Sequence, residues 1–436
     1  MTSTEFDAIV IGGGSGGLSF AQNAAAKGET IALIECDRLG GTYVNRGCMP
    51  KKMVWTVART IRDLAGLCAK GNVTGQARVD LAALSRQRRA RIDEIVESYG
   101  EKPDHAGVTR IKGTARLSGG RVVVNDHRLS AERVVLATGG RPARPPFDGA
   151  DLCDVGDDTL AWTAVPRRLA IVGAGYIGCE FAAIQAAFGA KVTLISDTYA
   201  VLTEFSKGLQ KIAAGNLRAQ GVTLTLGCKP TDVTTIKDGL RLTLDDGAVM
   251  TFDEVLLATG RAIKTRVLGD LAGRVTLTDS GHFATDDGLC TSHPNLYAVG
   301  DCADRLSLTP VAVDDWRVLA ERRFGNGADL VSLELVASAA FLLPPVAETV
   351  QRDLLSENNT STPPKNAVLQ NDSCDFWAFG GNDGTLAAVS LVGDGAPEAI
   401  GIAAQPIAAH HPMRRFHRAL PVHPTMTEGL LSAPYS

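Results

Sequence analysis

Residues 7–17 read Asp-Ala-Ile-Val-Ile-Gly-Gly-Gly-Ser-Gly-Gly, an apolar run that ends in a glycine-rich turn. Residues 18–27 have helical character, and residues 30–35 form a second apolar run. The turn holds a G-x-G-x-x-G spacing at Gly12, Gly14 and Gly17. In this motif the first glycine allows a tight turn, the second lets the backbone approach a pyrophosphate, and the third lets helix and strand pack closely. The stretch therefore predicts a strand–helix–strand unit that binds a dinucleotide.

Glu35 ends the second strand of this unit, 21 residues after Gly14. An acid at this place accepts hydrogen bonds from the adenosine ribose of a dinucleotide. A glycine motif alone is also compatible with an empty Rossmann-like turn. Here the two strands, the helix and the acid are all present, which favours a binding site.

The pattern recurs further along the chain. Residues 169–172 are apolar, residues 191–195 form the next strand, and a second motif lies between them at Gly173, Gly175 and Gly178. Two complete motifs predict two dinucleotides, and the economical pairing is FAD at the first and a nicotinamide nucleotide at the second, with hydride transfer between them. No arginine follows the second strand to hold a 2′-phosphate, whereas Asp197 can accept from a 2′-hydroxyl. This favours NADH over NADPH, with a turn or capping role for Asp197 as the alternative.

Two further strand ends extend the repeat. The sequence Ala-Thr-Gly occurs at residues 137–139 and again at residues 258–260, so the whole nucleotide-binding unit is doubled. A strand over residues 295–299 runs into Gly300-Asp301, where a carboxylate can accept from the ribityl hydroxyls of a flavin. An ordinary strand-end turn is the alternative for this Gly-Asp pair. Thr309-Pro310 then opens a helix to about Phe324.

The composition narrows the function classes. A chain of 436 residues predicts two to three domains. The formal net charge of −4 and the pI of about 6.1 argue against a nucleic-acid-binding role. The chain has no run of eighteen apolar residues and no basic and apolar leader, so neither a membrane span nor a secretion signal is expected. The nine cysteines include no C-x-x-C pair, which fits a reducing cytoplasm and argues against a metal site.

Residues 53–100 are expected to be helical, because apolar residues recur there at helical spacing. A basic cluster, Arg86 to Arg91, lies in the second half of this region. We interpret the cluster as a solvated helix face.

Residues 40–52 read Gly-Gly-Thr-Tyr-Val-Asn-Arg-Gly-Cys-Met-Pro-Lys-Lys and follow the first dinucleotide unit. Pro50 suits the first position of a helix, since its missing N–H would have no partner there. We therefore expect Cys48 just outside a helix N-terminus, where the partial positive charge favours a thiolate.

This stretch resembles the redox-active segment of the class I flavoprotein disulfide reductases, or pyridine nucleotide-disulfide oxidoreductases. The resemblance extends over nearly the whole chain and is nearest to the glutathione reductase branch. In that family the segment reads Gly-Gly-Thr-Cys-x4-Cys-x-Pro, and its two cysteines form the working disulfide. The second cysteine is present as Cys48, whereas Tyr43 replaces the first.

The resemblance implies an α/β fold with two Rossmann-like dinucleotide-binding domains, one for FAD and one for NAD(P), and an α+β C-terminal dimerisation domain. The expected bounds are 1–148 for the FAD domain, 149–262 for the NAD(P) domain, 263–328 for a central part that completes the FAD domain, and 329–436 for the dimerisation domain. It also implies a homodimer with active sites at the subunit interface, and the composition adds the expectation of a cytoplasmic protein with neither nucleic acid nor membrane as a partner.

The resemblance further implies two sets of cofactor-binding residues. Those expected at FAD are Gly12, Gly14, Ser15, Gly17, Glu35, Gly41, Thr42, Thr138, Gly139, Asp301 and Thr309. Those expected at the nicotinamide nucleotide are Gly173, Gly175, Tyr176, Ile177, Gly178, Asp197, Gly260 and Arg261. Tyr176 is expected to gate the nicotinamide pocket.

Catalytic and substrate residues follow from the same resemblance. Lys51 is expected to pair with Glu180 beside the reactive nitrogen of the flavin. His423, oriented by Glu428, is expected to act as the acid/base group in the active site of the partner subunit. The positions that correspond to glutathione-contacting or neighbouring residues are Ser15, Trp316 and Arg317, where Trp316 replaces a usual glycine.

Tyr43 leaves three hypotheses open, because a tyrosine forms no disulfide and its phenol, with a pKa of ~10, is a poor nucleophile at neutral pH. The first is an FAD-dependent NAD(P)H oxidoreductase that passes electrons to a small acceptor such as a quinone, directly or through Cys48 as the sole thiol. The second is a specialised thiol or disulfide enzyme that uses Cys48, Tyr43 and His423. The third is a non-catalytic FAD-binding scaffold or sensor.

Overall fold

The computed structural model describes residues 5–101, 107–324, 336–350, 375–380, 385–410 and 412. The chain divides into two units. The first consists of Met1–Met53, Ser85–Pro142 and Arg261–Val331, and the second of Val54–Leu84, Ala143–Gly260 and Ser332–Ser436. The division falls inside two long helices, α3 (Cys48–Ala69) and α4 (Leu81–Glu101).

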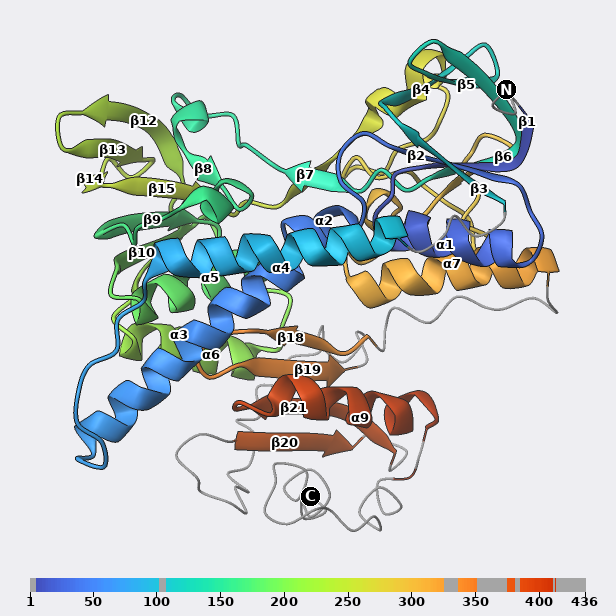
Figure 1. The fold of residues 1–436 in the computed structure, drawn as a ribbon. Coiled ribbons are helices and arrows are strands. Elements are labelled where there is room, and N and C mark those ends of the chain that lie inside the picture. The colour runs from blue at the N-terminus through green and yellow to red at the C-terminus, as the bar shows by residue number, and fades with distance from the viewer. Residues whose placement is uncertain are drawn as a thin grey trace. The chain divides into compact units, whose positions relative to one another are not determined.

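The first unit is built on a seven-stranded sheet in the order β3-β2-β1-β6-β5-β4, with β17 beside β6 (Figure 1). The strands are β1 (Glu5–Ile11), β2 (Ile31–Glu35), β3 (Val108–Lys112), β4 (Ala115–Ser118), β5 (Arg121–Val124), β6 (His127–Leu136) and β17 (Leu296–Ala298). The ladders that join β3, β2, β1, β6 and β17 are parallel, whereas β4 and β5 add an antiparallel hairpin.

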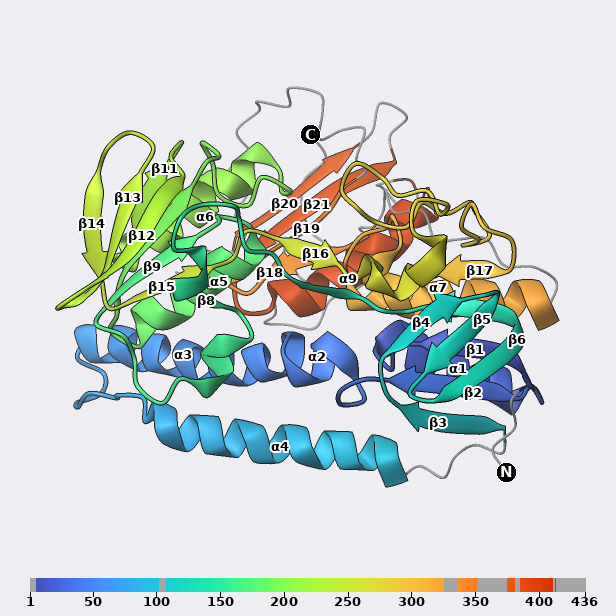
Figure 2. The same ribbon diagram turned by 90° about the horizontal axis from the view of Figure 1, so that it is seen from above.

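Strand β1 is buried on both faces, which explains its unbroken apolar run. Ile9 and Ile11 pack into a core that also receives η3 (Thr265–Leu271), whereas Ala8 and Val10 pack against α1 (Ser15–Ala26) and α7 (Thr309–Phe324). Figures 1 and 2 show α1 and α7 side by side along the sheet. The smaller elements of this unit are α2 (Gly41–Asn45), β7 (Gly140–Pro142), β16 (Arg261–Ile263) and η4 (Gly300–Cys302).

The second unit contains a five-stranded parallel sheet in the order β11-β10-β9-β15-β8. Its elements are η1 (Ala150–Leu152), β8 (Asp154–Val155), η2 (Asp158–Ala161), β9 (Arg168–Val172), α5 (Tyr176–Ala187), β10 (Lys191–Ser196), α6 (Lys207–Ala219), β11 (Thr223–Leu226) and β15 (Glu254–Leu257). An antiparallel sheet accompanies it, made of β12 (Pro230–Ile236), β13 (Gly239–Leu244) and β14 (Val249–Phe252). The order β10-β9-β15 repeats the order β2-β1-β6 of the first unit, as the doubled motifs predict.

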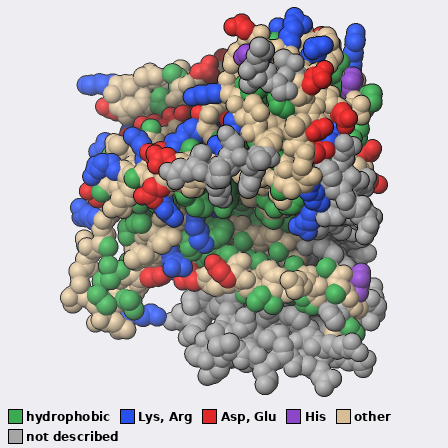
Figure 3. Space-filling model, turned by 45° about the vertical axis from the view of Figure 1, so that its right-hand side comes forward, with side chains coloured by type: hydrophobic (Ala, Val, Ile, Leu, Met, Phe, Trp, Pro, Cys, Tyr) green, Lys and Arg blue, Asp and Glu red, His purple; other side chains and the backbone are tan. Residues whose placement is uncertain are grey.

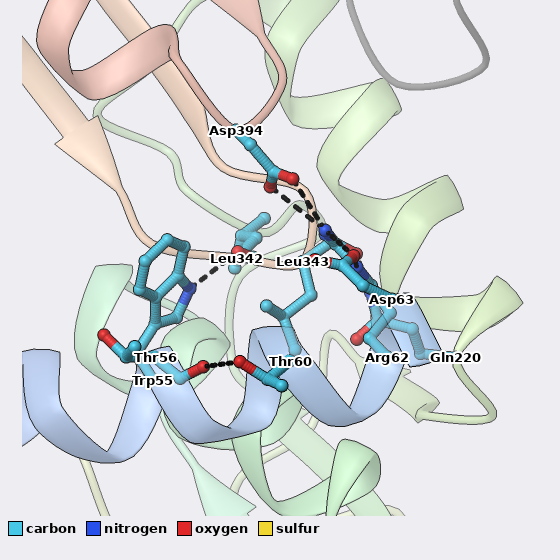
Figure 4. A network of polar contacts seen from close by, with 9 residues as sticks. All are labelled: Trp55, Thr56, Thr60, Arg62, Asp63, Gln220, Leu342, Leu343 and Asp394. Atoms are coloured by element: carbon cyan, nitrogen blue, oxygen red, sulfur yellow. Dashed lines mark hydrogen bonds and ion pairs between the residues drawn. The ribbon is translucent and has the colours of Figure 1, made fainter. Parts of the chain in front are cut away.

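The same unit holds an antiparallel sheet in the order β18-β19-β21-β20, on which α9 packs (Figure 2). These elements are β18 (Ser338–Ala340), β19 (Val346–Val350), β20 (Asp375–Gly380), β21 (Leu386–Val392) and α9 (Ala396–Ala408). The turn between β18 and β19 is tied to helices of the same unit (Figure 4). Trp55 Nε1 donates to Leu342 O at 3.0 Å, and Gln220 Nε2 donates to Leu343 O at 2.5 Å.

Arg62 of α3 strengthens this attachment, because its Nη2 lies 2.9 Å from Asp394 Oδ2 in the loop before α9 (Figure 4). The same guanidinium also donates to the neighbouring Asp63. The start of β19 pairs with the end of β21, so Trp55 and Arg62 of α3 hold the sheet at one and the same end.

Three sequence-based expectations need correction. Helix α3 begins at Cys48 and not after it, since Lys51 N donates to Gly47 O at 3.0 Å, so Pro50 lies at its third position. Proline is tolerated there because the first-turn N–H groups have no partner within the helix. The helical region 53–100 is two helices separated by residues 70–80. Arg88 is buried, so the basic cluster is not a uniformly solvated face.

Acidic and basic side chains are interspersed over the face drawn in Figure 3. Within the ranges that the structure describes, no helix is both long and apolar enough to cross a membrane.

Candidate active site

The first glycine turn is fixed by close backbone contacts. Gly12 has φ +115°, and a Cβ at this position would lie 2.2 Å from Ala137 O. A Cβ at Gly17 would lie 2.1 Å from Gly12 O. Both positions therefore require glycine for the turn and for the packing of α1.

A third glycine of the turn faces a second loop. A Cβ at Gly41 would lie 2.7 Å from Gly14 Cα, so the close approach of the two backbones requires glycine at residue 41. Gly14 is the N-cap of α1, and it makes no side-chain cap hydrogen bond; the first turn of this helix carries no acid. Such a helix end, with free backbone N–H groups and a positive partial charge, suits a phosphate anion. The glycine cradle and the uncapped helix fit the pyrophosphate of FAD.

Glu35 reaches back to this turn. Its Oε2 accepts from Gly13 N at 2.6 Å, and its Oε1 accepts from Asp37 N at 2.8 Å. The carboxylate therefore stabilises the loop itself, in addition to the ribose contact expected from the sequence.

Arg261 lies beside the first strand ends. Its Nη2 donates to Gly140 O at 2.6 Å and to Thr42 Oγ1 at 3.2 Å, and its Nε lies 3.5 Å from Asp301 Oδ2. The guanidinium thus brings together three segments of the predicted FAD site, after Thr138-Gly139, at Thr42 and at Asp301. The family resemblance placed Arg261 at the nicotinamide nucleotide, and that role stays a prediction.

A buried ion pair lies behind Asp301 and was missed by sequence reasoning. Asp315 Oδ2 accepts from Gly300 N at 2.8 Å, and its Oδ1 lies 2.9 Å from Arg305 Nε. Burial raises the pKa of the Asp315 carboxyl to about 6, although the Gly300 N–H and the Arg305 guanidinium act in the opposite direction. The pair holds the turn that carries Asp301. Its signal in the sequence is an acid on the apolar face of the helix that Thr309 begins.

The redox segment forms the short helix α2 and the start of α3. Asn45 Nδ2 donates to Leu39 O at 2.9 Å and to Gly41 O at 3.0 Å, which braces α2. Tyr43 is half-buried on α2, whereas Cys48 is exposed as the first residue of α3. Partial burial raises the pKa of the Tyr43 phenol, and the neighbouring Cys48 and Tyr99 side chains raise it further.

The second glycine turn repeats the first at two of its three positions. Gly173 has φ +108°, and a Cβ there would lie 2.3 Å from Ala258 O. A Cβ at Gly178 would lie 1.8 Å from Gly173 O. Gly175 differs from its counterpart Gly14, because a Cβ at Gly175 would meet nothing within 4 Å. This side of the turn is open.

The surroundings of α5 place further predicted residues. Tyr176 is exposed at the helix start, and its backbone N–H donates to Glu204 Oε1 at 3.2 Å. Asp197 is exposed directly after β10, and Ile177 is half-buried on the helix. Glu180 is buried, and its Oε1 accepts from Phe341 N at 2.8 Å.

The remaining predicted residues are distributed as follows. Ser15 begins α1, and Lys51 is half-buried in the first turn of α3. Trp316 packs partly against the core under α1, whereas Arg317 is exposed, with its Nη2 3.2 Å from Asp314 Oδ1. His423 and Glu428 lie outside the described residues.

Residues 6–315 match the family described as pyridine nucleotide-disulphide oxidoreductase. The chain belongs to this family. It is 34% identical to a glutathione reductase of Burkholderia cepacia over 448 residues, covering 99% of both chains. It is 29% identical to a trypanothione reductase of Trypanosoma congolense, covering 99% of this chain and 95% of the other.

A solved structure of another protein has the same fold as this chain. The HOCl-induced flavoprotein disulfide reductase RclA from Escherichia coli superposes with a TM-score of 0.84 over 97% of this chain and 98% of the other, at 22% identity. The predicted family and the α/β fold class are confirmed. The protein is an FAD-dependent pyridine-nucleotide oxidoreductase, and its cofactors are FAD and NAD(P)H.

Proposed function

We propose that this chain is an NAD(P)H oxidoreductase that works without a dithiol relay and passes electrons through its flavin to a small acceptor. The observation that carries the proposal is the redox segment. Tyr43 lies on α2 where the family has its first cysteine, and Cys48 is the only thiol within residues 40–52.

Tyr43 and Cys48 have different chemical capacities in this arrangement. Because its pKa is raised, Tyr43 remains a neutral phenol at neutral pH, so it is a hydrogen-bond and proton donor and not a nucleophile. Cys48 is exposed in the first turn of α3, so its thiol is accessible to small molecules. A single thiol of this kind can form a mixed disulfide or a sulfenic acid, but it has no cysteine within residues 40–52 to resolve it.

Reduction of the acceptor requires a proton that a side chain of the protein must donate. FAD, when bound, accepts a hydride from the nicotinamide nucleotide and passes two electrons to the acceptor. Reduction of a quinone to a quinol takes two electrons and two protons, of which one proton arrives with the hydride. The second proton needs a donor, and we assign this role to the Tyr43 phenol or to His423, with re-protonation from solvent.

The proposal includes the assembly and the domain bounds expected from the sequence. Residues 1–148 and 263–328 would hold FAD, residues 149–262 the nicotinamide nucleotide, and residues 329–436 the dimer contact. His423 and Glu428 would act in the active site of the partner subunit, in a cytoplasmic homodimer.

An anaerobic titration with NADH and with NADPH tests whether the flavin is reduced. We expect bleaching of the flavin absorbance with at least one nucleotide, followed by re-oxidation by a quinone. Absence of bleaching with both nucleotides would overturn the proposal in favour of a scaffold or sensor.

Three variants then separate the roles of the redox segment. Cys48→Ala is expected to retain quinone reduction if electrons leave the flavin directly, and to abolish it if Cys48 carries them. Tyr43→Phe keeps the ring and removes the proton donor, so it should slow turnover and leave flavin bleaching unchanged. Efficient reduction of glutathione disulfide by the unmodified protein would contradict the absence of a dithiol relay, and Tyr43→Cys is the matched gain-of-function control.

A further inference from the structure

The loop after β10 carries an aromatic ring and two carboxylates, and one of the carboxylates, Glu204, contacts the start of α5. It runs from Asp197 to Ser206, and this stretch contains two acids and no lysine or arginine. Asp197 follows β10 directly, 22 residues after Gly175. This is the place at which an acid accepts from the ribose 2′-hydroxyl of a dinucleotide.

The loop is held firmly by its own backbone. Gly227 N donates to Thr198 O and Cys228 N donates to Ser196 O, each at 3.0 Å. Within the loop, Thr198 Oγ1 donates to Ala200 O at 2.8 Å. The ends of β10 and β11 are therefore fastened together, and the residues between Ser196 and Ala200 keep a defined conformation.

Tyr199 lies in this hydrogen-bonded loop, and its ring extends into solvent. The side chain is 88% exposed, yet one side of the ring lies against Gly227, where a Cβ would come within 2.6 Å of Cε1. A single exposed aromatic residue is ordinary on a protein surface. Tyr199, however, is positioned by a hydrogen-bonded loop and follows the expected ribose acceptor, Asp197, by two residues. Its exposed ring offers a surface on which a nucleobase can stack. Aromatic rings placed in this way stack on adenine irrespective of hydrogen bonding.

The second carboxylate occupies an anion position. Glu204 Oε1 accepts from Tyr176 N at the start of α5, where the pyrophosphate of a dinucleotide would be bound. Glu204 is exposed, so its side chain is free to swing away. A 2′-phosphate adds about two negative charges at neutral pH to a loop that already carries the charges of Asp197 and Glu204.

We propose that Asp197 and Tyr199 form an adenosine site selective for NADH, in which Asp197 accepts from the ribose 2′-hydroxyl, Tyr199 stacks on adenine, and Glu204 is displaced by the pyrophosphate. This inference deepens the proposed function by naming its electron donor. It requires no electron transfer, so binding alone can test it.

The experiment measures equilibrium binding of ADP-ribose and of 2′-phospho-ADP-ribose to the oxidised holoenzyme by calorimetry. Neither probe carries a nicotinamide, so a failure of the redox proposal leaves the result unaffected. We expect ADP-ribose to bind at least about tenfold more tightly than the 2′-phosphate form. Equal binding, or tighter binding of the phosphate form, would overturn the inference.

Four variants assign the effect to residues, and their side chains are exposed, so folding should be retained. Asp197→Asn should reduce the discrimination between the two probes, whereas the exposed acid of the β12–β13 turn gives the matched control Asp238→Asn, which should leave it unchanged. Tyr199→Ala should weaken both probes by about tenfold, and Tyr199→Phe should restore them.

Glu204→Gln should strengthen both probes by a similar factor, because it weakens an internal competitor without contacting the 2′ position. If Asp197→Asn discriminates between the two probes as well as the unmodified protein does, Asp197 does not bind the ribose. If Tyr199→Ala binds both probes with unchanged affinity, Tyr199 does not stack on adenine. Either result contradicts the inference as stated.

Discussion

The two glycine turns of this chain share their outer positions and differ at the middle one. Gly12 and Gly173 both have a positive φ and both approach the carbonyl of an Ala-Thr-Gly strand end, at 2.2 and 2.3 Å from a hypothetical Cβ. At the middle position, Gly14 lies against the backbone of Gly41, whereas Gly175 faces open space. The first turn is also tied to an acid, Glu35, through its own backbone.

This difference separates what glycine does for the fold from what it does for the ligand. The first and third glycines are required by contacts inside the strand–helix unit, so they are the same in both halves. The middle glycine serves the approach of a dinucleotide, and its surroundings differ because the first turn is partly enclosed by a second loop. An enclosed turn fits a permanently held cofactor, and an open one fits a nucleotide that exchanges.

The largest expected effect is on the free energy of unfolding, and it comes from the first glycine of each turn, Gly12 and Gly173. Gly12→Ala and Gly173→Ala should each lower the free energy of unfolding by about 3 kcal/mol or more, because strained φ and backbone overlap combine. Urea unfolding of the two variants measures this. Wild-type stability of either variant would show that the turn relaxes easily and would break the equivalence of the two halves.

The acids that follow the second strands should differ in their effect. Glu35→Ala removes the acceptor of two backbone N–H groups and should cost about 1–3 kcal/mol of unfolding free energy. Asp197→Ala is the matched change in the other half, and it should alter stability by less than about 0.5 kcal/mol because its side chain is exposed. Similar losses in both variants, again by urea unfolding, would contradict the distinction between a loop-stabilising acid and a ligand-facing one.

The middle glycines should affect ligands and leave the fold intact. Gly14 and Gly175 have φ −79° and −71°, values that alanine adopts freely, and a Cβ at either would make at most ordinary contact. Gly14→Ala should therefore fold normally but lose bound FAD, measured by its absorbance after purification. Gly175→Ala should keep FAD and bind ADP-ribose more weakly; loss of FAD in this variant would contradict the assignment of the two turns.

The smallest expected effect is a difference between two cysteines in their rate of alkylation, which is measured without changing the stability of the protein. Cys36 follows Glu35, and partial burial of its thiol, together with the Glu35 carboxylate, raises the pKa of this thiol. A raised pKa means less thiolate at pH 7, so its alkylation by iodoacetamide should be slow at that pH and accelerate above the ordinary thiol pKa of ~8.5. Cys179 on α5 is fully buried, and burial raises its pKa too.

Cys179 should therefore stay unmodified until the protein is unfolded in urea, which also supplies the positive control. Peptide mass spectrometry follows both sites in one sample. Labelling of Cys179 in the folded protein at the rate of Cys36 would show that α5 opens readily.

The sequence predicted both strand–helix–strand units because their signals are local. The glycine spacing, the apolar strands and the following acid all lie within about thirty residues. The contacts that shape the site are not local. Arg261 follows the second unit in the sequence but belongs to β16, which pairs with β7 of the first. The contacts of Arg261 with Thr42, Gly140 and Asp301 could therefore not be read from its position after Gly260.

Burial was the other source of error. Arg88 belongs to a basic run, and Asp315 is one of two consecutive acids, so each has the composition of a surface. Both are buried, and each is held by a polar contact from another residue, Arg88 by Ser85 Oγ at 3.1 Å and Asp315 by Gly300 N. The position of Asp315 on the apolar face of its helix was a signal in the sequence, whereas the composition of the basic run gave no such signal for Arg88.

The pairing of β17 with β6 has a consequence for the order of events during synthesis. All strands of the second parallel sheet have been made once Leu257 leaves the ribosome, although that sheet begins later in the chain. The first sheet still lacks the strand that sets Leu296 beside Val134, and the turn with Asp301 follows only after it. The parallel sheet that is begun first is therefore completed last, and the turn with Asp301 is made only after the second parallel sheet has all its strands.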